Sequence, residues 1–150
     1  MKNQYYIFTD GGARGNPGPA ATGFLVKNSS GKILVQLGKL IGETTNNVAE
    51  YVAVIEALTW IKEHKEVLNS KLSTFNFYLD SQLVVNQLNG FYKIKQEKLR
   101  HLIIKVKSLE QEVDGRVFYN LISRDKNKIA DSLVNQTLGE KNKKDYKLFT

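Results

Sequence analysis

The alternation of apolar and polar residues over the first forty positions is typical of three consecutive strands. Aromatic and β-branched residues fill positions 5–9 and stop at Asp10, so we expect a strand that ends on a carboxylate. The glycine-rich stretch over 13–23 is expected to be a flexible turn. Residues 23–28 and 33–42 then predict an antiparallel hairpin with Gly31 in its turn.

Helical periodicity begins in the middle of the chain. Several capping candidates at 44–47 precede apolar residues that repeat at the helical period to about residue 64. Residues 75–79 predict an apolar strand that ends at Asp80. Ser81 is then expected to cap a short helix that stops at Asn89-Gly90.

Two helices and one strand complete the pattern. A helix over roughly 95–112 is predicted by the apolar stripe Leu99, Leu102, Ile103, Val106 and Leu109. Residues 116–122 predict a fifth strand, and Asn127 is expected to cap a last helix with inward residues Ile129, Ala130, Leu133, Val134 and Leu138. This order of elements predicts an α/β fold, with a mixed sheet covered by helices on both faces.

Composition limits the class of protein. The 150 residues, 41% hydrophobic, suit one domain over 1–140, followed by a basic and flexible C-terminal tail over 141–150. Because cysteine is absent, disulfides, thiolate metal sites and a cysteine nucleophile are excluded. No stretch resembles a signal peptide or a membrane span, so we expect a cytoplasmic protein with no membrane partner, and a monomer.

The formal charge of +7 favours a polyanionic partner such as nucleic acid. The positive charge is concentrated on the helix predicted over 95–112 and just before it. Its members are Lys93, Lys95, Lys98, Arg100, Lys105 and Lys107, against Glu97 alone. With Phe91 this segment is expected to grip a duplex, although a merely solvated helix face explains the charges equally well.

Four acids stand at the start or end of predicted elements. Asp10 and Asp80 each follow an apolar strand, so their carboxylates meet at one sheet edge if the two strands are parallel neighbours. Converging carboxylates repel unless a cation neutralises them, and oxygen ligands favour magnesium or manganese. Glu50 and Asp131 lie in the first turns of helices, where the helix dipole is an alternative explanation.

At these positions the sequence closely resembles the type I ribonuclease H family. The motifs that carry the resemblance are Thr9-Asp10-Gly11-Gly12, Asn16-Pro17-Gly18, Ala21-Thr22-Gly23, Thr45-Asn46-Asn47-Val48-Ala49-Glu50, Leu79-Asp80-Ser81 and the segment from Asn127 to Asp131. They cover nearly the whole chain in the expected order. The segment after Asp80 is most similar to the archaeal and related bacterial branch.

The resemblance implies a ribonuclease H-like fold, with three antiparallel strands followed by two parallel ones. It implies an endonuclease that hydrolyses the RNA strand of RNA–DNA hybrids and leaves 5′-phosphate and 3′-hydroxyl ends. Two Mg²⁺ ions, or Mn²⁺, are expected with substrate bound. By the same resemblance Asp10 bridges the two ions, Asp131 helps to hold the ion that activates water, and Glu50 with Asp80 holds the ion on the leaving-group side.

Substrate contacts are also implied by the resemblance. Minor-groove recognition of the RNA 2′-hydroxyl is expected from Gly11, Gly12, Asn46 and Asn47, with Ser81 and Arg124 as further binding residues. Phe91 and Lys93 are expected to bind the duplex on the evidence of the aromatic and basic segment itself, in place of a basic protrusion that this sequence lacks. The sequence departs from many members by lacking a histidine in the loop 123–126, where Arg124 is expected to bind phosphate instead. His64 and His101 are expected to have no catalytic role.

Three other interpretations compete with this one. A nucleotide-binding loop at 11–23 is disfavoured, because the lysine-serine ending is missing and a strand follows. A catalytically silent binding module of the same fold would be favoured by loss of an acid, and all four acids are present. A DNA-cutting integrase or transposase core would need a third acid placed differently and additional DNA-binding domains.

Overall fold

The fold is built on a five-stranded mixed sheet. A computed structural model describes the backbone of residues 3–147 and the side chains of residues 3–139. The strands are β1 (Asn3–Ala13), β2 (Gly18–Lys27), β3 (Ile33–Thr44), β4 (Ser73–Leu79) and β5 (Arg116–Leu121), in the spatial order β3-β2-β1-β4-β5. β1, β2 and β3 are antiparallel, while β4 and β5 run parallel to β1. The predicted fold class is confirmed.

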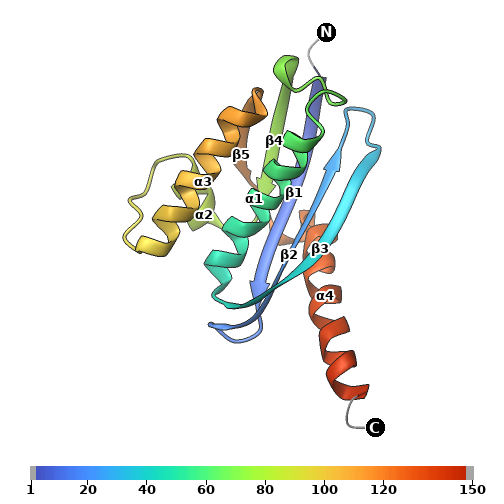
Figure 1. The fold of residues 1–150 in the computed structure, drawn as a ribbon, viewed down its shortest axis with the longest axis vertical. Helices are drawn as coiled ribbons and strands as arrows, with labels where there is room; N and C mark the ends of the chain where they lie inside the picture. The colour runs from blue at the N-terminus through green and yellow to red at the C-terminus, as the bar shows by residue number, and fades with distance from the viewer. Residues whose placement is uncertain (1–2, 148–150) are drawn as a thin grey trace.

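Helices cover both faces of this sheet. They are α1 (Asn46–Glu63), α2 (Gln82–Leu88), α3 (Glu97–Val113) and α4 (Lys128–Lys147), with short 3₁₀ turns η1 (Ser70–Leu72) and η2 (Arg124–Lys126). Neighbouring residues of β1 define the two sides, since Gly11 contacts α1 at Ala49 and Gly12 contacts α4 at Val134. Figure 1 shows α1 and α3 in front of the sheet and α4 behind β2 and β3.

The main core lies between the sheet and α1. Ile7, Phe75 and Phe77 from alternate strand positions are fully buried there, together with Tyr51 and Leu58 of α1. The stripe predicted for α3 also faces inward, with Leu99, Val106 and Leu109 buried. This packing holds the first turns of α1 against the carboxyl end of β1.

The predicted strand boundaries near the N-terminus were wrong. β1 continues to Ala13, so Asp10 lies inside the strand, and β2 already begins at Gly18. The predicted flexible turn therefore shrinks to residues 14–17, around a cis Asn16–Pro17 peptide bond. The glycines there suggested a turn, but those at 11, 12 and 23 are strand residues that helices approach closely.

The last helix also differs from its prediction. Ala130, Val134 and Leu138 are buried as expected, but Ile129 is 42% exposed and lines an open pocket beside Phe8 and Lys27. The backbone of α4 is helical to Lys147, and residues 148–150 lie outside the described residues. The domain boundary at 140 and the flexible tail over 141–150 stay predictions. Among the helices described, none has the length and apolar character needed to cross a membrane.

Candidate active site

The parallel register of β1 and β4 brings Asp10 beside Asp80. Phe8 pairs with Tyr78 at the end of this ladder, and two residues further along the two strands are the two aspartates. β4 ends at Leu79, whereas β1 continues with β2 as its partner. The condition that the two strands are parallel neighbours is met, and the acids stand where the strand order changes direction.

Glu50 reaches the same place from the first turns of α1. Thr45 caps this helix by accepting a hydrogen bond from the Val48 amide at 3.3 Å. Asn46 then joins the helix to β1, since its Oδ1 accepts from the Ala13 amide at 2.7 Å. A β-carbon at Gly11 would overlap the backbone of Ala49, so this close approach of helix and strand requires glycine.

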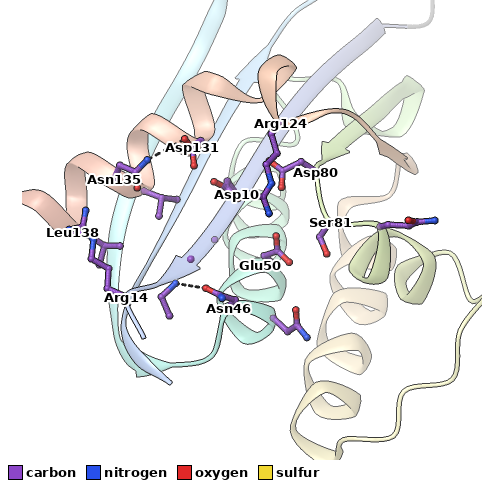
Figure 2. Close-up of a pocket in the computed structure, with 16 residues that line it drawn as sticks. Asp10, Arg14, Asn46, Glu50, Asp80, Ser81, Arg124, Asp131, Asn135 and Leu138 are labelled. Atoms are coloured by element: carbon purple, nitrogen blue, oxygen red, sulfur yellow. Dashed lines mark hydrogen bonds between the residues drawn. The ribbon is translucent and has the colours of Figure 1, made fainter. Parts of the chain in front are cut away.

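The carboxylates of Asp10, Glu50 and Asp80 form a compact cluster. One oxygen from each lies within 4.8 Å of the others. Asp131 faces the cluster from the first turn of α4 and is exposed, with its Oδ2 accepting from Asn135 Nδ2 at 3.2 Å (Figure 2). All four predicted acids thus meet at one cleft, three of them closely.

Ionisation of all three carboxylates in this cluster at once is unfavourable. Burial raises the pKa of Asp10 to about 8, and the charges of Asp80, Glu50 and Asp131 contribute to this rise in that order. Burial likewise raises the pKa of Glu50 to about 7, against a hydrogen bond from Ser81 and the charge of Arg124. Without a bound cation, Asp10 and Glu50 retain protons near neutral pH. The site therefore favours the binding of a positive ion.

The donor set fits a divalent metal ion. Three carboxylates offer hard oxygen ligands at mutual distances that one ion or two could bridge. Asp80 is held in place by Asn127, whose Nδ2 donates to Asp80 Oδ2 at 3.1 Å and to the Thr9 carbonyl at 2.9 Å. Such support of a ligand is typical of metal sites.

Asn127 had been expected to cap α4 with its side chain. It does precede the helix, and its carbonyl accepts from the Asp131 amide at 3.1 Å. Its side-chain Oδ1, however, is buried and has no hydrogen-bond partner among the described residues. The residue instead links the start of α4 to β1 and Asp80.

A cleft of about 690 Å³ surrounds the acids. Its lining includes six of the predicted substrate-binding residues: Gly11, Gly12, Asn46, Asn47, Ser81 and Arg124. Ser81 is already engaged, because its Oγ accepts from the Val84 amide at 3.3 Å, and its proximity to Glu50 opposes the rise in the pKa of that carboxyl. Phe91 and Lys93 are absent from the described lining and lie on the exposed segment between α2 and α3, so their role stays a prediction.

Sequence reasoning missed several residues of the cleft. Arg14 lies on its wall next to Leu138, as Figure 2 shows, and Gln82 and Asn135 also line it. A signal existed for Asn135, which follows Asp131 by one helical turn and therefore shares its face. No local pattern pointed to Arg14, because its position depends on the fold of the turn 14–17.

The two histidines lie elsewhere. His64 ends α1, stacks on Trp60 and has its Nδ1 2.7 Å from the Trp60 carbonyl oxygen. His101 is exposed on α3, with its Nε2 3.7 Å from Glu97. Neither is among the described residues that line the cleft.

Comparison with known proteins gives a consistent result. Residues 8–137 match a family model described as reverse transcriptase-like. The structure of LC11 ribonuclease H1, isolated from compost, superimposes with a TM-score of 0.86 at 39% identity, covering 92% of this chain and 97% of that one. The same LC11 protein in complex with an RNA/DNA hybrid superimposes with a TM-score of 0.82.

Curated relatives agree. Ribonuclease HI of Halobacterium salinarum is 33% identical over 135 residues, which is 90% of this chain and 64% of that protein. A bifunctional protein of Mycobacterium tuberculosis is 34% identical over 133 residues. The chain spans only 35% of the length of that mycobacterial protein.

Proposed function

The chain belongs to the ribonuclease H family, and from this premise we propose that it is an endoribonuclease that hydrolyses the RNA strand of RNA–DNA hybrids. The observation that carries the proposal is the convergence of Asp10, Glu50 and Asp80 in an open cleft of about 690 Å³. The expected products carry 5′-phosphate and 3′-hydroxyl ends. The complex of LC11 ribonuclease H1 with an RNA/DNA hybrid supports the choice of substrate.

Asp10, Glu50, Asp80 and Asp131 are the residues proposed to hold two Mg²⁺ ions, with Mn²⁺ as an alternative. Such ions, when bound, acidify an attacking water and stabilise negative charge on the leaving 3′ oxygen. The raised pKa values of Asp10 and Glu50 are consistent with this assignment: burial is their main cause, the neighbouring carboxylates add to it, and a bound cation would offset both effects.

The other residues of the cleft have positioning roles in this proposal. Asn127 fixes the Asp80 carboxylate by a hydrogen bond, so this ligand is oriented before substrate arrives, and Ser81 lies close enough to Glu50 to favour its charged form. Arg124 lies near enough to lower the pKa of Glu50 and can pair with a phosphate of the scissile strand. Gly11, Gly12, Asn46 and Asn47 remain the candidates for contact with RNA 2′-hydroxyls.

The exposed lysines around the start of α3 are proposed to grip the duplex. Of the six cations in the basic segment, two also bind backbone carbonyls: Arg100 donates to Ile94 and Lys95, and Lys107 donates to Leu88. Lys93, Lys95 and Lys98 are exposed. A monomeric state and a cytoplasmic location also remain our predictions.

Cleavage assays test the proposed activity. Purified protein with Mg²⁺ or Mn²⁺ is expected to cut the RNA of a labelled hybrid and to leave double-stranded DNA intact. Asp80→Asn should abolish turnover while retaining the fold, because it removes one ligand charge and keeps the shape. Asp125→Asn, an exposed acid outside the cleft lining, is the matched control. Hybrid binding without cleavage by the wild type would instead favour the silent module.

The basic segment can be tested by the salt dependence of hybrid binding. Replacing Lys93, Lys95 and Lys98 by Gln should flatten the slope of log affinity against log salt by roughly 2–3, about one for each phosphate left without a lysine. The control replaces three exposed lysines elsewhere, Lys32, Lys65 and Lys71, with the same change of net charge. Equal slopes for the two triple variants would refute a localised grip.

A further inference from the structure

Strands β1, β4 and β5 carry aromatic side chains on one face of the sheet, and α4 covers this face only in part. Strand alternation places Tyr6 and Phe8 on the same side of β1 as Gly12, which contacts α4. The register aligns Tyr6 with Asn76 and Phe118, and Phe8 with Tyr78 and Asn120. α4 packs along β1, β2 and β3, so Phe118 of β5 is left 51% exposed.

Three of these rings form a row across two strands. The ring centroids of Phe8 and Tyr78 are 5.1 Å apart with an interplanar angle of 22°. Those of Tyr6 and Tyr78 are 6.4 Å apart at 24°. Phe118 lies on the next strand, opposite Asn76. We call Tyr6, Phe8, Tyr78 and Phe118 the aromatic sheet face.

The side-chain amide nitrogens between the rings donate to groups of the sheet. Asn76 Nδ2 donates to Gln4 Oε1 at 2.9 Å and to the Tyr5 carbonyl at 3.2 Å. Asn120 Nδ2 donates to the Phe77 carbonyl at 3.1 Å. The amide nitrogens of both residues are therefore engaged with the protein, and the rings supply the apolar surface available to a ligand.

Positive charge surrounds the aromatic sheet face. Lys27 Nζ lies 5.5 Å from the centroid of Phe8, and a pocket of about 120 Å³ joins these two residues to Lys126 and Lys128. Among the described residues that line this pocket, Asp125 is the one acid. On the far strand Arg116 is exposed on the same side as Phe118, two residues away.

We propose that the aromatic sheet face binds a short single-stranded stretch of nucleic acid, with bases stacked on Tyr6 and Phe118 and phosphates paired with Lys27, Lys126 and Lys128. Rings flanked by cations are the combination that binds single strands, because every base has a π-face and every linkage a negative charge. The positive surroundings complement such a polyanion.

This second surface is separate from the cleft. η2 divides the two, with Arg124 on the cleft wall and Lys126 in the pocket beside Phe8. Binding of a single strand therefore does not depend on cleavage. If the proposed function holds, the aromatic sheet face would retain the single-stranded extension of a hybrid while the duplex part occupies the cleft.

Fluorescence anisotropy in EDTA tests the inference without cleavage. The probe is fluorescein-labelled oligothymidylate of about twelve nucleotides, which lies within the site sizes of single-strand-binding folds and is long enough to cover both rings and the lysine pocket. Phe118→Val and Tyr6→Val keep β-propensity and remove one ring each, so each should weaken binding about tenfold. Lys27→Gln should flatten the salt slope by about 0.7. Leu37→Val on β3, where the side chain is 46% exposed, should bind as the wild type does.

The outcomes separate this inference from the proposed function. Unchanged binding by both ring variants, with thermal stability retained, would overturn it. So would sedimentation showing a dimer that Phe118→Val dissociates, because a second copy would then occupy the face. Ring variants should cut a blunt hybrid at the wild-type rate. If the wild-type protein bound the oligonucleotide but cut no hybrid, binding at the aromatic sheet face would be supported and the proposed ribonuclease activity would be refuted.

Discussion

Replacing Asp10 by Asn should stabilise the metal-free protein at alkaline pH while removing its activity. Folding raises the pKa of Asp10 from 3.8 to about 8, chiefly through burial. Between these two values the folded state binds a proton that the unfolded state has lost. The free energy of unfolding therefore falls as pH rises through this window, by about 1.4 kcal/mol for each pH unit.

The magnitude follows from the width of that window. From about pH 5 to about pH 8 the contribution of Asp10 amounts to roughly 4 kcal/mol of lost stability. Asparagine has nearly the same shape and carries no charge at any pH, so the variant escapes this loss. The stability difference between Asp10→Asn and wild type should thus grow with pH, by about 2–4 kcal/mol over this range.

Urea denaturation in EDTA at several pH values measures the difference directly. Asp125→Asn is the control, because a hydrogen bond from Ser123 lowers the pKa of Asp125 and its charged form is already favoured. The control should show no gain as pH rises. A difference between Asp10→Asn and wild type that stays constant from pH 5 to pH 8, or a variant less stable than wild type at pH 8, would refute the electrostatic reasoning.

Two further substitutions probe the supports of the site. Gly11→Ala should lower the free energy of unfolding by about 1–3 kcal/mol and reduce hybrid cleavage, because the added methyl displaces Glu50 with the first turns of α1. Gly139→Ala is the control in thermal melts, because a β-carbon at Gly139 meets no other atom. Equal losses of stability in the two variants would contradict the overlap at Gly11. Asn127→Ala should weaken Mn²⁺ binding about tenfold or more by calorimetry, and wild-type affinity would show that Asp80 needs no such support.

The pairing of Asp10 with Asp80 could be found from sequence because local and tertiary signals coincide there, although β1 continues past Asp10. The apolar runs before Asp10 and Asp80 are strands, and parallel pairing of those strands sets the two side chains together. The Ser81 cap was also predictable, since its acceptor role depends only on the next three residues. These features need no knowledge of distant contacts.

Other features depended on contacts that no local pattern encodes. The glycines at 11 and 23 suggested a loop, but they are strand residues that allow α1 and α4 to approach the sheet. The cleft wall at Arg14 and the link from Asn127 to Asp80 join segments that are distant in the sequence and that only the fold brings together. For the same reason, Ile129 looked like an inward residue from its sequence position but is exposed.

The four acids are not equivalent, and the difference can be measured. Asp10 is mostly buried and opposed by three other carboxylates, so its charge destabilises the fold. Asp131 is exposed in the first turn of α4, where the helix dipole favours a negative charge. Neutralising Asp131 should therefore lower stability slightly, by about 0.3–1 kcal/mol, while neutralising Asp10 raises it.

Both substitutions should nevertheless reduce turnover, because each removes a charge proposed to hold a metal ion. Opposite effects on metal-free stability with a shared loss of activity would separate the two roles of these acids, as contributors to the fold and as ligands. If Asp131→Asn stabilised the metal-free protein as Asp10→Asn does, the carboxylate of Asp131 would have to lie deeper in the cluster than its exposure indicates.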